Sequence, residues 1–365
     1  MKILFLHNKP PYPPKDGSAL ATFNMAMGLA DLGHEVHILS MNTHKHYLDI
    51  NKIPENISKK ITIIPIDIDT KIKIIPFLKN LLFSSRAYNL ERFIQKKFEN
   101  ELISILKKID FDIIQMEGLY TAPYLEIIKK LSKAKTINRS HNMEFEIWER
   151  KAKNSQNFLK KLYYQIISKR LKNEEIFWFN KFNGFIAISN RDLNKAKELG
   201  LKSHSMVIPV GVPEKNNTIN YNIKNFYYLG SMDWEPNQEA MNWFLKEIWP
   251  EFHKNNPNWK FYLAGRNMPQ SFKNIKLDGY INCGEVEDLN LFLSDKNVLI
   301  SPLFSAGGIR VKLVESLMEG RCIIASDIAA EGIIIENGVN ILIANDKNEF
   351  IEQMELVTNN PIQIE

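Results

Sequence analysis

Three charged side chains, Arg310, Lys312 and Glu315, follow a glycine pair at Gly307 and Gly308. The apolar run before the glycines is typical of a strand, and the residues after them have the spacing of a helix. Backbone N–H groups at a helix N-terminus attract anions, and two cations beside them strengthen that preference. A carboxylate one turn inside the helix can accept hydrogen bonds from ribose hydroxyls. The pattern predicts a site for a phosphorylated nucleoside, but it equally fits a tight turn with solvated charges.

Other residues that could do chemistry give weaker signals. His141 lies in a loop after an apolar run at residues 135–138, and a lone loop histidine is more often a packing or surface residue. Asp-x-Asp pairs at 67–69 and 110–112 are short enough to arise by chance, and the histidines at 44–46 lack a further ligand at metal-binding spacing. We therefore expect no metal site. A Gly-x-Gly-x-x-Gly motif does not follow the first strand, which argues against a nicotinamide dehydrogenase.

Apolar strand-like runs alternate with helical stretches along the chain. Most runs are continuous Val, Ile, Leu and Phe, as expected for parallel strands that are buried on both faces. Such alternation builds doubly wound α/β sheets. The first half predicts strands at residues 3–7, 35–40, 61–66, 112–116, 135–138, 185–188 and 205–208. The second half predicts strands at residues 226–229, 260–264, 275–277, 298–300, 322–325 and 341–343.

Length and strand count together indicate two domains. A chain of 365 residues exceeds one ordinary core, and its strands fall into two sets of six or seven. Residues 208–222 are rich in Pro, Gly and Asn and form the best linker. We therefore expect two Rossmann-like, doubly wound parallel-sheet domains, at residues 1–212 and 213–365. Ligands of open α/β sheets bind beyond the carboxyl ends of the strands, so we expect the site in a cleft that the two domains face.

The two halves of the chain carry opposite net charge. Residues 1–212 hold 34 Lys and Arg against 21 Asp and Glu, and the other residues hold 13 against 21. Basic and apolar residues are interspersed at 71–97 and 158–182, which fits helices with a solvated basic face or a surface for anionic membrane. The charge imbalance favours a membrane surface or a lipid-linked acceptor. Nucleic acid is not expected, because no exposed platform of aromatic residues is identifiable.

Cysteine content and hydropathy indicate the cellular compartment of the protein. Cys283 and Cys322 lie among apolar or small residues and are expected to be reduced thiols. No apolar run reaches the length of a membrane span, and the opening MKILFLHN is too short for a secretory signal. We expect a cytoplasmic protein, with peripheral attachment at the inner face of the membrane left open by the charge pattern.

Several segments resemble, in order, the motifs of the retaining glycosyltransferases of the GT-B fold, family-four type (glycosyl transferases group 1). They include PPYPPKDGSALATFNMAMGLADLGHEVHIL, NRSHNMEFEIW, VIPVGV, YLGSMDWEPN, FYLAGRNMP and SPLFSAGGIRVKLVESLMEG. The match spans nearly the whole chain, and the motifs are specific in combination. The resemblance implies two Rossmann-like domains that bind a nucleotide-diphospho-sugar, with the acceptor mainly on the first domain and the donor mainly on the second. Apart from this donor substrate we expect no cofactor and no metal requirement.

The resemblance also implies roles for individual residues. Glu315 would hold the ribose hydroxyls, the backbone at 308–311 would meet the diphosphate, and His141 would lie beside the donor sugar. Gly17 would let the first domain approach the phosphates. Catalytic roles fall to His141, Arg310 and Lys312. Donor binding falls to Gly17, Gly230, Ser231, Gly265, Gly307, Gly308, Ile309, Val311 and Glu315.

Three departures from the family pattern bear on this assignment. The family often carries two glutamates eight positions apart, and here the first of these positions is Gly307. The loop GSMDWEPN has no Arg or Lys for the diphosphate, so we hypothesise that Arg310 and Lys312 take that role. The sequence stops at Glu365, soon after its last expected strand, which leaves open whether the family's final crossover helices are missing.

The sequence thus predicts a glycosyltransferase that moves a sugar, with retention, to a glycan or lipid-linked acceptor in surface polysaccharide or glycan assembly. One alternative is a nucleotide-sugar epimerase of the same fold, which would use carboxylates for acid–base work. Another is a non-catalytic partner subunit that binds nucleotide, which the replacement of glutamate by Gly307 motivates. The sugar, base, acceptor and linkage are not decided by the sequence.

Overall fold

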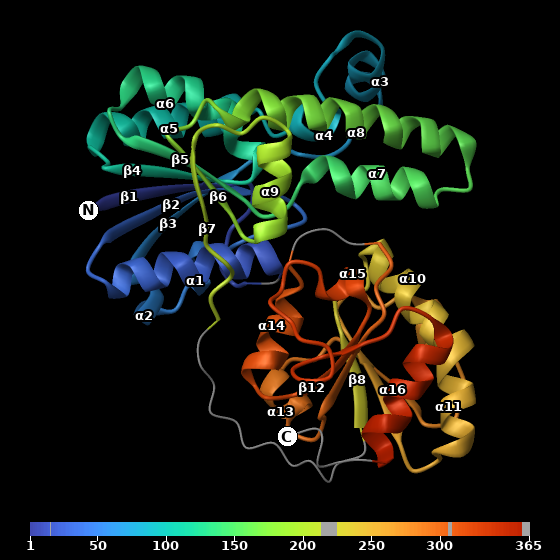
Figure 1. Ribbon diagram of the computed structural model, residues 1–365. Coiled ribbons are helices and arrows are strands. Elements are labelled where there is room, and N and C mark those ends of the chain that lie inside the picture. Colours follow the sequence, from blue (N-terminus) through green and yellow to red (C-terminus); the bar gives the residue numbers. More distant parts are fainter. Residues whose placement is uncertain (15, 213–224, 306–308, 360–365) are drawn as a thin grey trace. The chain divides into compact units, whose positions relative to one another are not determined.

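The computed structural model describes residues 1–14, 16–212, 225–305 and 309–359 (Figure 1). The chain forms two compact units: Met1–Gly211, and Val212–Ala306 with Arg310–Glu365. Each unit holds one parallel sheet with helices on both faces, so the expected doubly wound α/β architecture is confirmed. No helix of the described ranges is long and apolar enough to cross a membrane.

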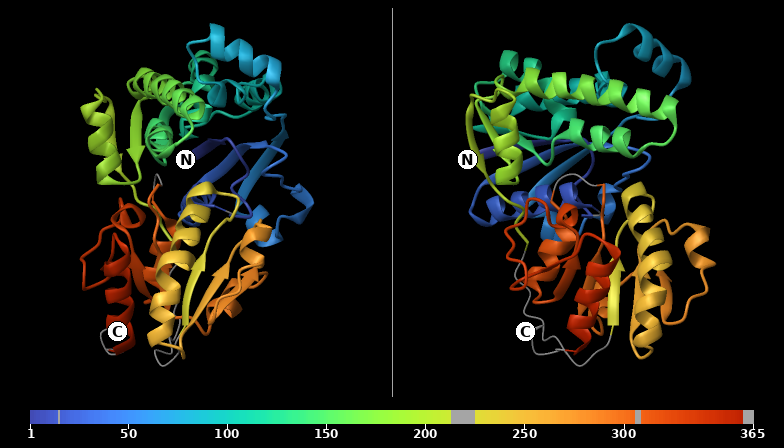
Figure 2. Two further views of the ribbon diagram at one scale, coloured as in Figure 1. Left: turned by 90° about the vertical axis from the view of Figure 1, so that its right-hand side faces the viewer. Right: turned by 45° about the vertical axis from the view of Figure 1, so that its right-hand side comes forward.

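The first unit contains a seven-stranded sheet in the order β3-β2-β1-β4-β5-β6-β7. Its strands are β1 (Lys2–His7), β2 (Glu35–Asn42), β3 (Ile61–Asp67), β4 (Ile113–Glu117), β5 (Lys135–Ser140), β6 (Gly184–Ala187) and β7 (His204–Val207). Its α-helices are α1 (Gly17–Asp31), α2 (Glu55–Ser58), α3 (Ile74–Phe83), α4 (Tyr88–Glu91), α5 (Lys96–Lys108), α6 (Leu125–Leu131), α7 (Glu144–Asn154), α8 (Phe158–Phe179) and α9 (Asn190–Glu198). Figure 2 shows α1 on one face of this sheet and the long α8 on the other.

The second unit contains a six-stranded parallel sheet in the order β10-β9-β8-β11-β12-β13. Its strands are β8 (Asn225–Leu229), β9 (Lys260–Ala264), β10 (Tyr280–Gly284), β11 (Val298–Ser301), β12 (Cys322–Ala325) and β13 (Leu342–Ile343). Its α-helices are α10 (Glu235–Trp243), α11 (Trp249–Asn255), α12 (Gln270–Lys273), α13 (Leu289–Leu293), α14 (Val311–Met318), α15 (Asp327–Ala330) and α16 (Lys347–Asn359).

Alternate side chains of the central strand β1 fill two separate cores. Leu4 and Leu6 belong to the cluster on one face of the sheet, and Ile3 and Phe5 belong to the cluster on the other. Successive side chains of a strand point to opposite faces, so a strand covered on both sides is apolar throughout. This burial explains why continuous apolar runs predicted these strands.

The strand expected at residues 275–277 is wrong. Ile275 and Leu277 pack against the core of the second unit from a loop, and the strand is β10, which begins at Tyr280. Between them Gly279 adopts a positive φ of 71°, and a Cβ there would come within 2.3 Å of the His253 ring. The strand therefore begins only after the turn at Gly279, and the apolar residues before it are half-buried against the core without pairing as a strand.

Candidate functional site

The strand order of the first sheet brings the carboxyl ends of β1 and β4 together. The chain runs outward from β1 through β2 to β3 and then returns to β4 on the other side of β1. His7 ends β1, Glu117 ends β4, and the register pairs these two residues directly. Ligands of open α/β sheets bind at such a reversal of strand order. The loops at this edge are therefore where the first unit would hold a ligand.

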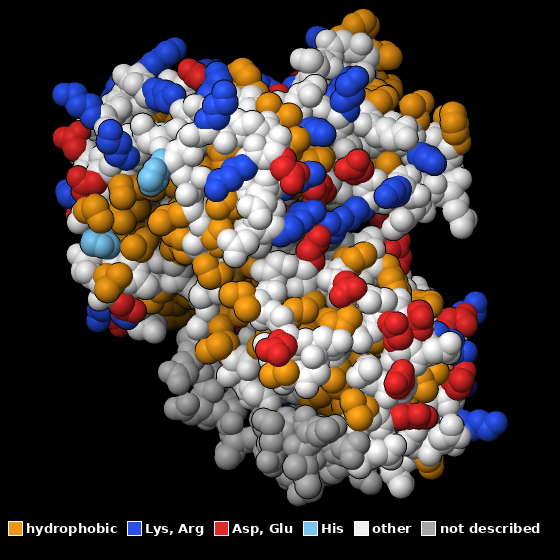
Figure 3. Space-filling view, in the orientation of Figure 1, with side chains coloured by type: hydrophobic (Ala, Val, Ile, Leu, Met, Phe, Trp, Pro, Cys, Tyr) orange, Lys and Arg blue, Asp and Glu red, His pale blue; other side chains and the backbone are white. Residues whose placement is uncertain are grey.

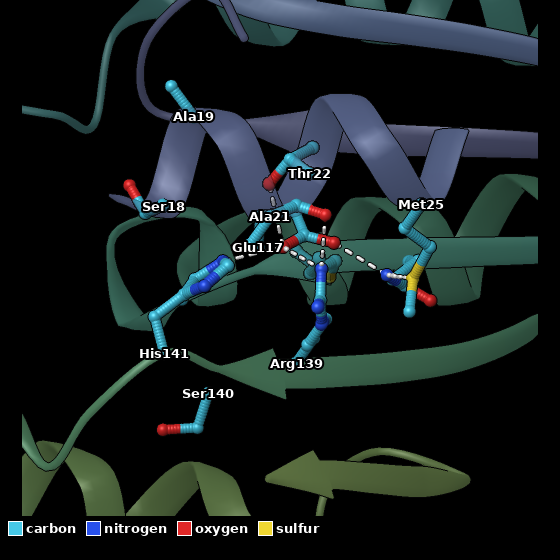
Figure 4. A network of polar contacts seen from close by, with 12 residues as sticks. Ser18, Ala19, Ala21, Thr22, Met25, Glu117, Arg139, Ser140 and His141 are labelled. Carbon is cyan, nitrogen blue, oxygen red and sulfur yellow. Dashed lines mark hydrogen bonds and ion pairs between the residues drawn. The ribbon is translucent and has the colours of Figure 1, made fainter. Parts of the chain in front are cut away.

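A buried carboxylate, Glu117, lies at the centre of a polar network at this edge (Figure 4). Its Oε2 atom is 2.6 Å from Nε2 of His141 and accepts a hydrogen bond of 3.0 Å from Oγ1 of Thr22. Its Oε1 atom accepts a bond of 2.5 Å from Gln115, and the Arg139 guanidinium is 3.7 Å from Oε2. Four elements, α1, β4, β5 and the loop after β5, thus meet at one side chain.

The charges of this network determine the protonation state and the tautomer of His141. Burial raises the pKa of Glu117, but the Arg139 charge and the hydrogen bond with His141 outweigh it and hold that pKa at about 2. Burial lowers the pKa of His141, and this outweighs the opposing influence of Glu117. An ionised carboxylate only accepts hydrogen bonds, so Nε2 of the neutral imidazole carries the proton and Nδ1 carries the lone pair. The network therefore presents an oriented hydrogen-bond acceptor.

Gly17 is the first residue of α1, whose N-terminus is capped by Asp16. The Asp16 carboxylate accepts from the Ala19 N–H at 3.1 Å and from the Lys9 ammonium at 2.7 Å. Such a cap satisfies one of the backbone N–H groups left over at a helix start. The same helix carries Thr22, whose hydroxyl donates to Glu117, the carboxylate that contacts His141. Helix α1 therefore links the predicted Gly17 to the network around His141.

In the second unit, Gly230 and Gly265 let two loops lie against each other. The Gly230 N–H donates to the Ala264 carbonyl at 3.1 Å, and a Cβ at Gly265 would come within 1.8 Å of the Gly230 oxygen. Only glycine tolerates such close approach of two backbones. Directly after them, the Ser231 hydroxyl accepts a hydrogen bond of 2.7 Å from the Arg266 guanidinium. These contacts place a cation beside the loop GSMDWEPN, which has none of its own.

Helix α14 brings the predicted Lys312 and Glu315 next to β8. The Lys312 ammonium lies 3.6 Å from the centroid of the Tyr228 ring, two residues before Gly230. Burial, aided by the Arg310 charge, lowers the pKa of Lys312 well below its ordinary value. Glu315 is half-buried and lines a pocket of about 20 Å³, enough for about one water molecule. An anion near Lys312 would restore the charged form that burial disfavours.

Arg310, the residue before α14, contacts the segment of α15. Its guanidinium is buried, donates to the Ile328 carbonyl at 3.1 Å and lies 3.9 Å from the Glu331 carboxylate. Val311 begins α14 and Ile309 lies just before it, half-buried. The predicted Gly307 and Gly308 lie outside the described residues. The structure thus gathers Gly230, Ser231, Gly265, Lys312 and Glu315 around β8, while the guanidinium of Arg310 binds the segment of α15.

The charged residues Glu117, Arg139 and Arg266 of these clusters are among those that sequence reasoning missed. Glu117 and Arg139 sit at or near the ends of apolar runs, but an acidic or basic residue there is informative only once the strands are known to be neighbours. Arg266 follows Gly265 in FYLAGRNMP, and this adjacency to a predicted site glycine is the signal that could have found it. Among the residues the structure describes, no group of three or more His, Cys, Asp or Glu could hold a metal ion.

Two parallel-sheet α/β units in one chain match the GT-B class of fold, as the solved structures below support. The model described as "Glycosyltransferase Family 4" matches residues 15–215, and the model described as "Glycosyl transferases group 1" matches residues 223–360. The first alone spans more than half of the chain. The protein therefore belongs to the group 1 glycosyltransferases of the family-four type.

Individual relatives are distant in sequence. An uncharacterized 44.6 kDa protein in the cps region of Klebsiella pneumoniae is 23% identical over 97% of this chain and 90% of its own. Sucrose-phosphate synthase from Thermosynechococcus elongatus matches with a TM-score of 0.75 at 14% identity, over 100% of this chain and 91% of its own. A TarM variant from S. aureus, with fondaparinux, α-GlcNAc-glycerol and UDP, has a TM-score of 0.69 at 12% identity, over 100% and 94%. HepE from Anabaena, with UDP-glucose, has a TM-score of 0.64 at 11% identity, over 100% and 91%. These structures support the fold.

Proposed function

We propose that this glycosyltransferase takes its sugar from a nucleotide-diphospho-sugar and transfers it, with retention, to a glycan or lipid-linked acceptor. The observation that supports the donor assignment is the contact of α14 with β8, in which Lys312 lies over the Tyr228 ring and Glu315 lines a small pocket with Leu229, the residue before Gly230. Structures of similar fold hold UDP or UDP-glucose, which supports a nucleotide sugar. The cps-region relative supports a setting in polysaccharide assembly.

The second unit would bind the donor through charge and hydrogen bonding. The Glu315 carboxylate would accept from the ribose hydroxyls, and Lys312 and Arg266 would neutralise the diphosphate. Fixed cations aimed at a leaving group lower the barrier because they stabilise charge as it develops. We propose that these cations supply the charge that a metal ion supplies in other sugar transferases, so that the enzyme needs no added metal. Transfer measured with excess EDTA should match transfer measured without it.

The first unit would orient the reacting sugar. We propose that Nδ1 of His141 accepts a hydrogen bond from a sugar hydroxyl, with Glu117 holding the imidazole in the required tautomer. In a retaining transfer of this kind, the sugar–diphosphate bond breaks as the acceptor oxygen bonds to the same carbon on the same face. The acceptor proton passes to an oxygen of the departing diphosphate. No protein nucleophile is required, and the contribution of the protein is orientation and charge stabilisation.

Replacing Glu315 by alanine tests the donor site. Charge-assisted hydrogen bonds contribute roughly 1.5–3 kcal/mol each in a protected site, so Glu315→Ala should weaken UDP binding at least about tenfold. Isothermal calorimetry measures the affinity. Glu352→Ala, which removes an exposed carboxylate from α16, is the matched control and should bind UDP like the wild type. Equal affinities of the two variants would contradict the assignment.

The same protein distinguishes the alternative functions. Sugar transfer to an acceptor panel, with release of nucleoside diphosphate, supports the proposal. Epimerisation of a nucleotide sugar without acceptor would identify the epimerase. Tight UDP binding, with neither donor hydrolysis nor transfer across the panel, would identify a non-catalytic subunit.

A further inference from the structure

Helix α3 turns an apolar face toward solvent. Ile74, Ile75, Leu78 and Leu82 are 75%, 80%, 48% and 71% exposed, and their spacing places them on one side of the helix. Phe83, at the end of α3, is 83% exposed. A surface helix of a globular protein ordinarily turns its apolar face inward and its polar face outward. The orientation of α3 is therefore the reverse of what folding alone would favour.

Specific contacts hold α3 in this orientation. The Phe77 ring packs edge-on against Tyr88 and Tyr163, with centroids 5.6 and 5.5 Å away. Asn80 is buried on the same side, where its amide donates to the Arg86 carbonyl at 3.1 Å and its oxygen accepts from Arg170 at 3.2 Å. A buried amide with several hydrogen bonds fixes the rotation of the helix. The packing of Phe77 and the hydrogen bonds of Asn80 thus hold the apolar face of α3 toward solvent.

The start of α8 extends the exposed apolar surface. Phe158, Leu159 and Leu162 are 76%, 74% and 46% exposed, and the next residue, Tyr163, contacts Phe77 of α3. We name the combined surface the apolar tip. Figure 3 shows apolar side chains gathered over α3 at the top of the view, with basic side chains beside them. The apolar tip consists of Ile72, Ile74, Ile75, Leu78, Leu82, Phe83, Phe158, Leu159 and Leu162.

The segments that form the apolar tip are uniformly basic. Residues 70–90 hold four Lys and Arg, residues 150–173 hold eight, and neither segment contains Asp or Glu. Neighbouring acids pair with some of these cations: Asp69 is 3.0 Å from Lys73, and Glu174 is 2.8 Å from Arg86. Lys71, Lys79, Lys160 and Lys161 are exposed. Clusters of cations beside apolar side chains are the pattern of protein surfaces that bind anionic lipid.

We propose that the apolar tip inserts into the interface of an anionic lipid bilayer, with the surrounding lysines on the lipid headgroups. A second copy of the chain is disfavoured as the occupant, because it would bring the same cations against each other. Each lysine near an anionic surface contributes about fivefold in affinity, and the contribution falls within a Debye length. The proposal does not depend on the identity of the sugar donor. It would place an acceptor carried by a lipid beside the first unit.

Vesicle flotation of the full chain tests the proposal. The wild type should float with phosphatidylcholine vesicles that contain phosphatidylglycerol, should not float with pure phosphatidylcholine, and should be released as salt rises. The double substitution Leu82→Ser with Phe83→Ser should weaken binding at least about tenfold, because burial of either side chain exceeds about 1.4 kcal/mol. Ile334→Ser with Val339→Ser, at residues 89% and 73% exposed in the second unit, is the matched control and should bind normally.

Three results would overturn the proposal. The first is absence of flotation with anionic vesicles at low salt, and the second is equal binding by the two double variants. The third is concentration-dependent self-association in lipid-free sedimentation that only the Leu82→Ser, Phe83→Ser variant loses, which would make the apolar tip a contact between copies. UDP affinity, measured in parallel, should be the same in all three proteins. Failure of flotation with intact UDP binding would therefore leave the proposed donor site standing.

Discussion

At the scale of single residues, the Glu117–Arg139 pair shows what stabilises a buried charge and what that charge contributes to the site. Both side chains are fully buried, where an isolated ion would be costly. The carboxylate is balanced by Arg139 and by hydrogen bonds from Thr22 and Gln115. Breaking such a pair typically costs 3–5 kcal/mol, although its net stabilisation is small. What the carboxylate adds is a fixed tautomer for His141, which an apolar residue could not supply.

His141 should therefore affect transfer more than nucleotide binding. His141→Ala should lower turnover strongly, on the order of a hundredfold as for loss of a positioned hydrogen-bonding group, with UDP affinity within about twofold of the wild type. Steady-state transfer assays and calorimetry give the two quantities.

Glu117→Gln provides the companion test, because it keeps the shape of the side chain and removes its charge. Histidine ring-nitrogen NMR should then show loss of the single Nε2–H tautomer, together with a lower kcat. Near wild-type turnover of His141→Ala on the true acceptor would return this histidine to a packing role.

At the scale of elements, the sequence predicts a strand or helix where the surroundings of that segment leave a recognisable residue pattern. The strands at residues 3–7, 260–264 and 322–325 were predictable because both of their faces are buried, which leaves a continuous apolar run. The loop before β10 has the same local composition, and only the turn at Gly279 separates it from a strand. The predicted Glu315 and Lys312 lie on one helix, so their spacing was informative. Glu117 ends β4 and His141 lies in the loop after β5, so their meeting depends on sheet order.

Helix α3 illustrates the opposite limit. Its composition predicted either an ordinary apolar core face or a membrane surface, and no periodicity separates these alternatives. The outward face is decided by the contacts of Phe77 and Asn80, which depend on Tyr88, Tyr163 and Arg170. Sequence alone could not supply these tertiary contacts.

The anchoring role of Asn80 can be measured directly. Asn80→Ala removes the amide that bonds the Arg86 carbonyl and Arg170, so α3 should open locally more often. Hydrogen exchange at the amides of residues 77–84 should accelerate about tenfold or more, since each lost buried hydrogen bond costs roughly 1–3 kcal/mol. Lys79→Ala, one position earlier on the exposed side, is the control and should exchange like the wild type. Equal protection in both variants would show that α3 is held by other contacts.

At the scale of the whole molecule, the buried groups of the first sheet make stability depend on pH. Burial, with the Lys9 charge, lowers the pKa of His7 to about 3. Between about pH 6.5 and pH 3, the unfolded chain therefore binds a proton at residue 7 that the folded chain does not. Stability that is complete above pH 6.5 is lost as pH falls through this window. The lowered pKa of Glu117 extends the loss toward pH 2.

Urea unfolding at pH 7.5 and pH 5.5 measures this dependence. For the wild type the free energy of unfolding should fall by about 1.4 kcal/mol through His7 alone, because one proton contributes that amount per pH unit below its unfolded pKa. His7→Leu should reduce the difference between the two pH values by the same amount. An unchanged difference would mean that residue 7 is protonated in the folded protein.

The strand order of the first sheet also determines when, during synthesis, strand β1 can gain its two neighbours. Ile3 of β1 pairs with Val36 of β2 on one side and with Ile113 of β4 on the other. As the chain leaves the ribosome, one edge of the apolar strand β1 therefore stays unpaired until β4 is made, 110 positions later. An unpaired apolar edge recruits other strands, and growing chains with such edges are prone to aggregate. Stalling before Ile113 would thus leave a nascent chain that depends on chaperones.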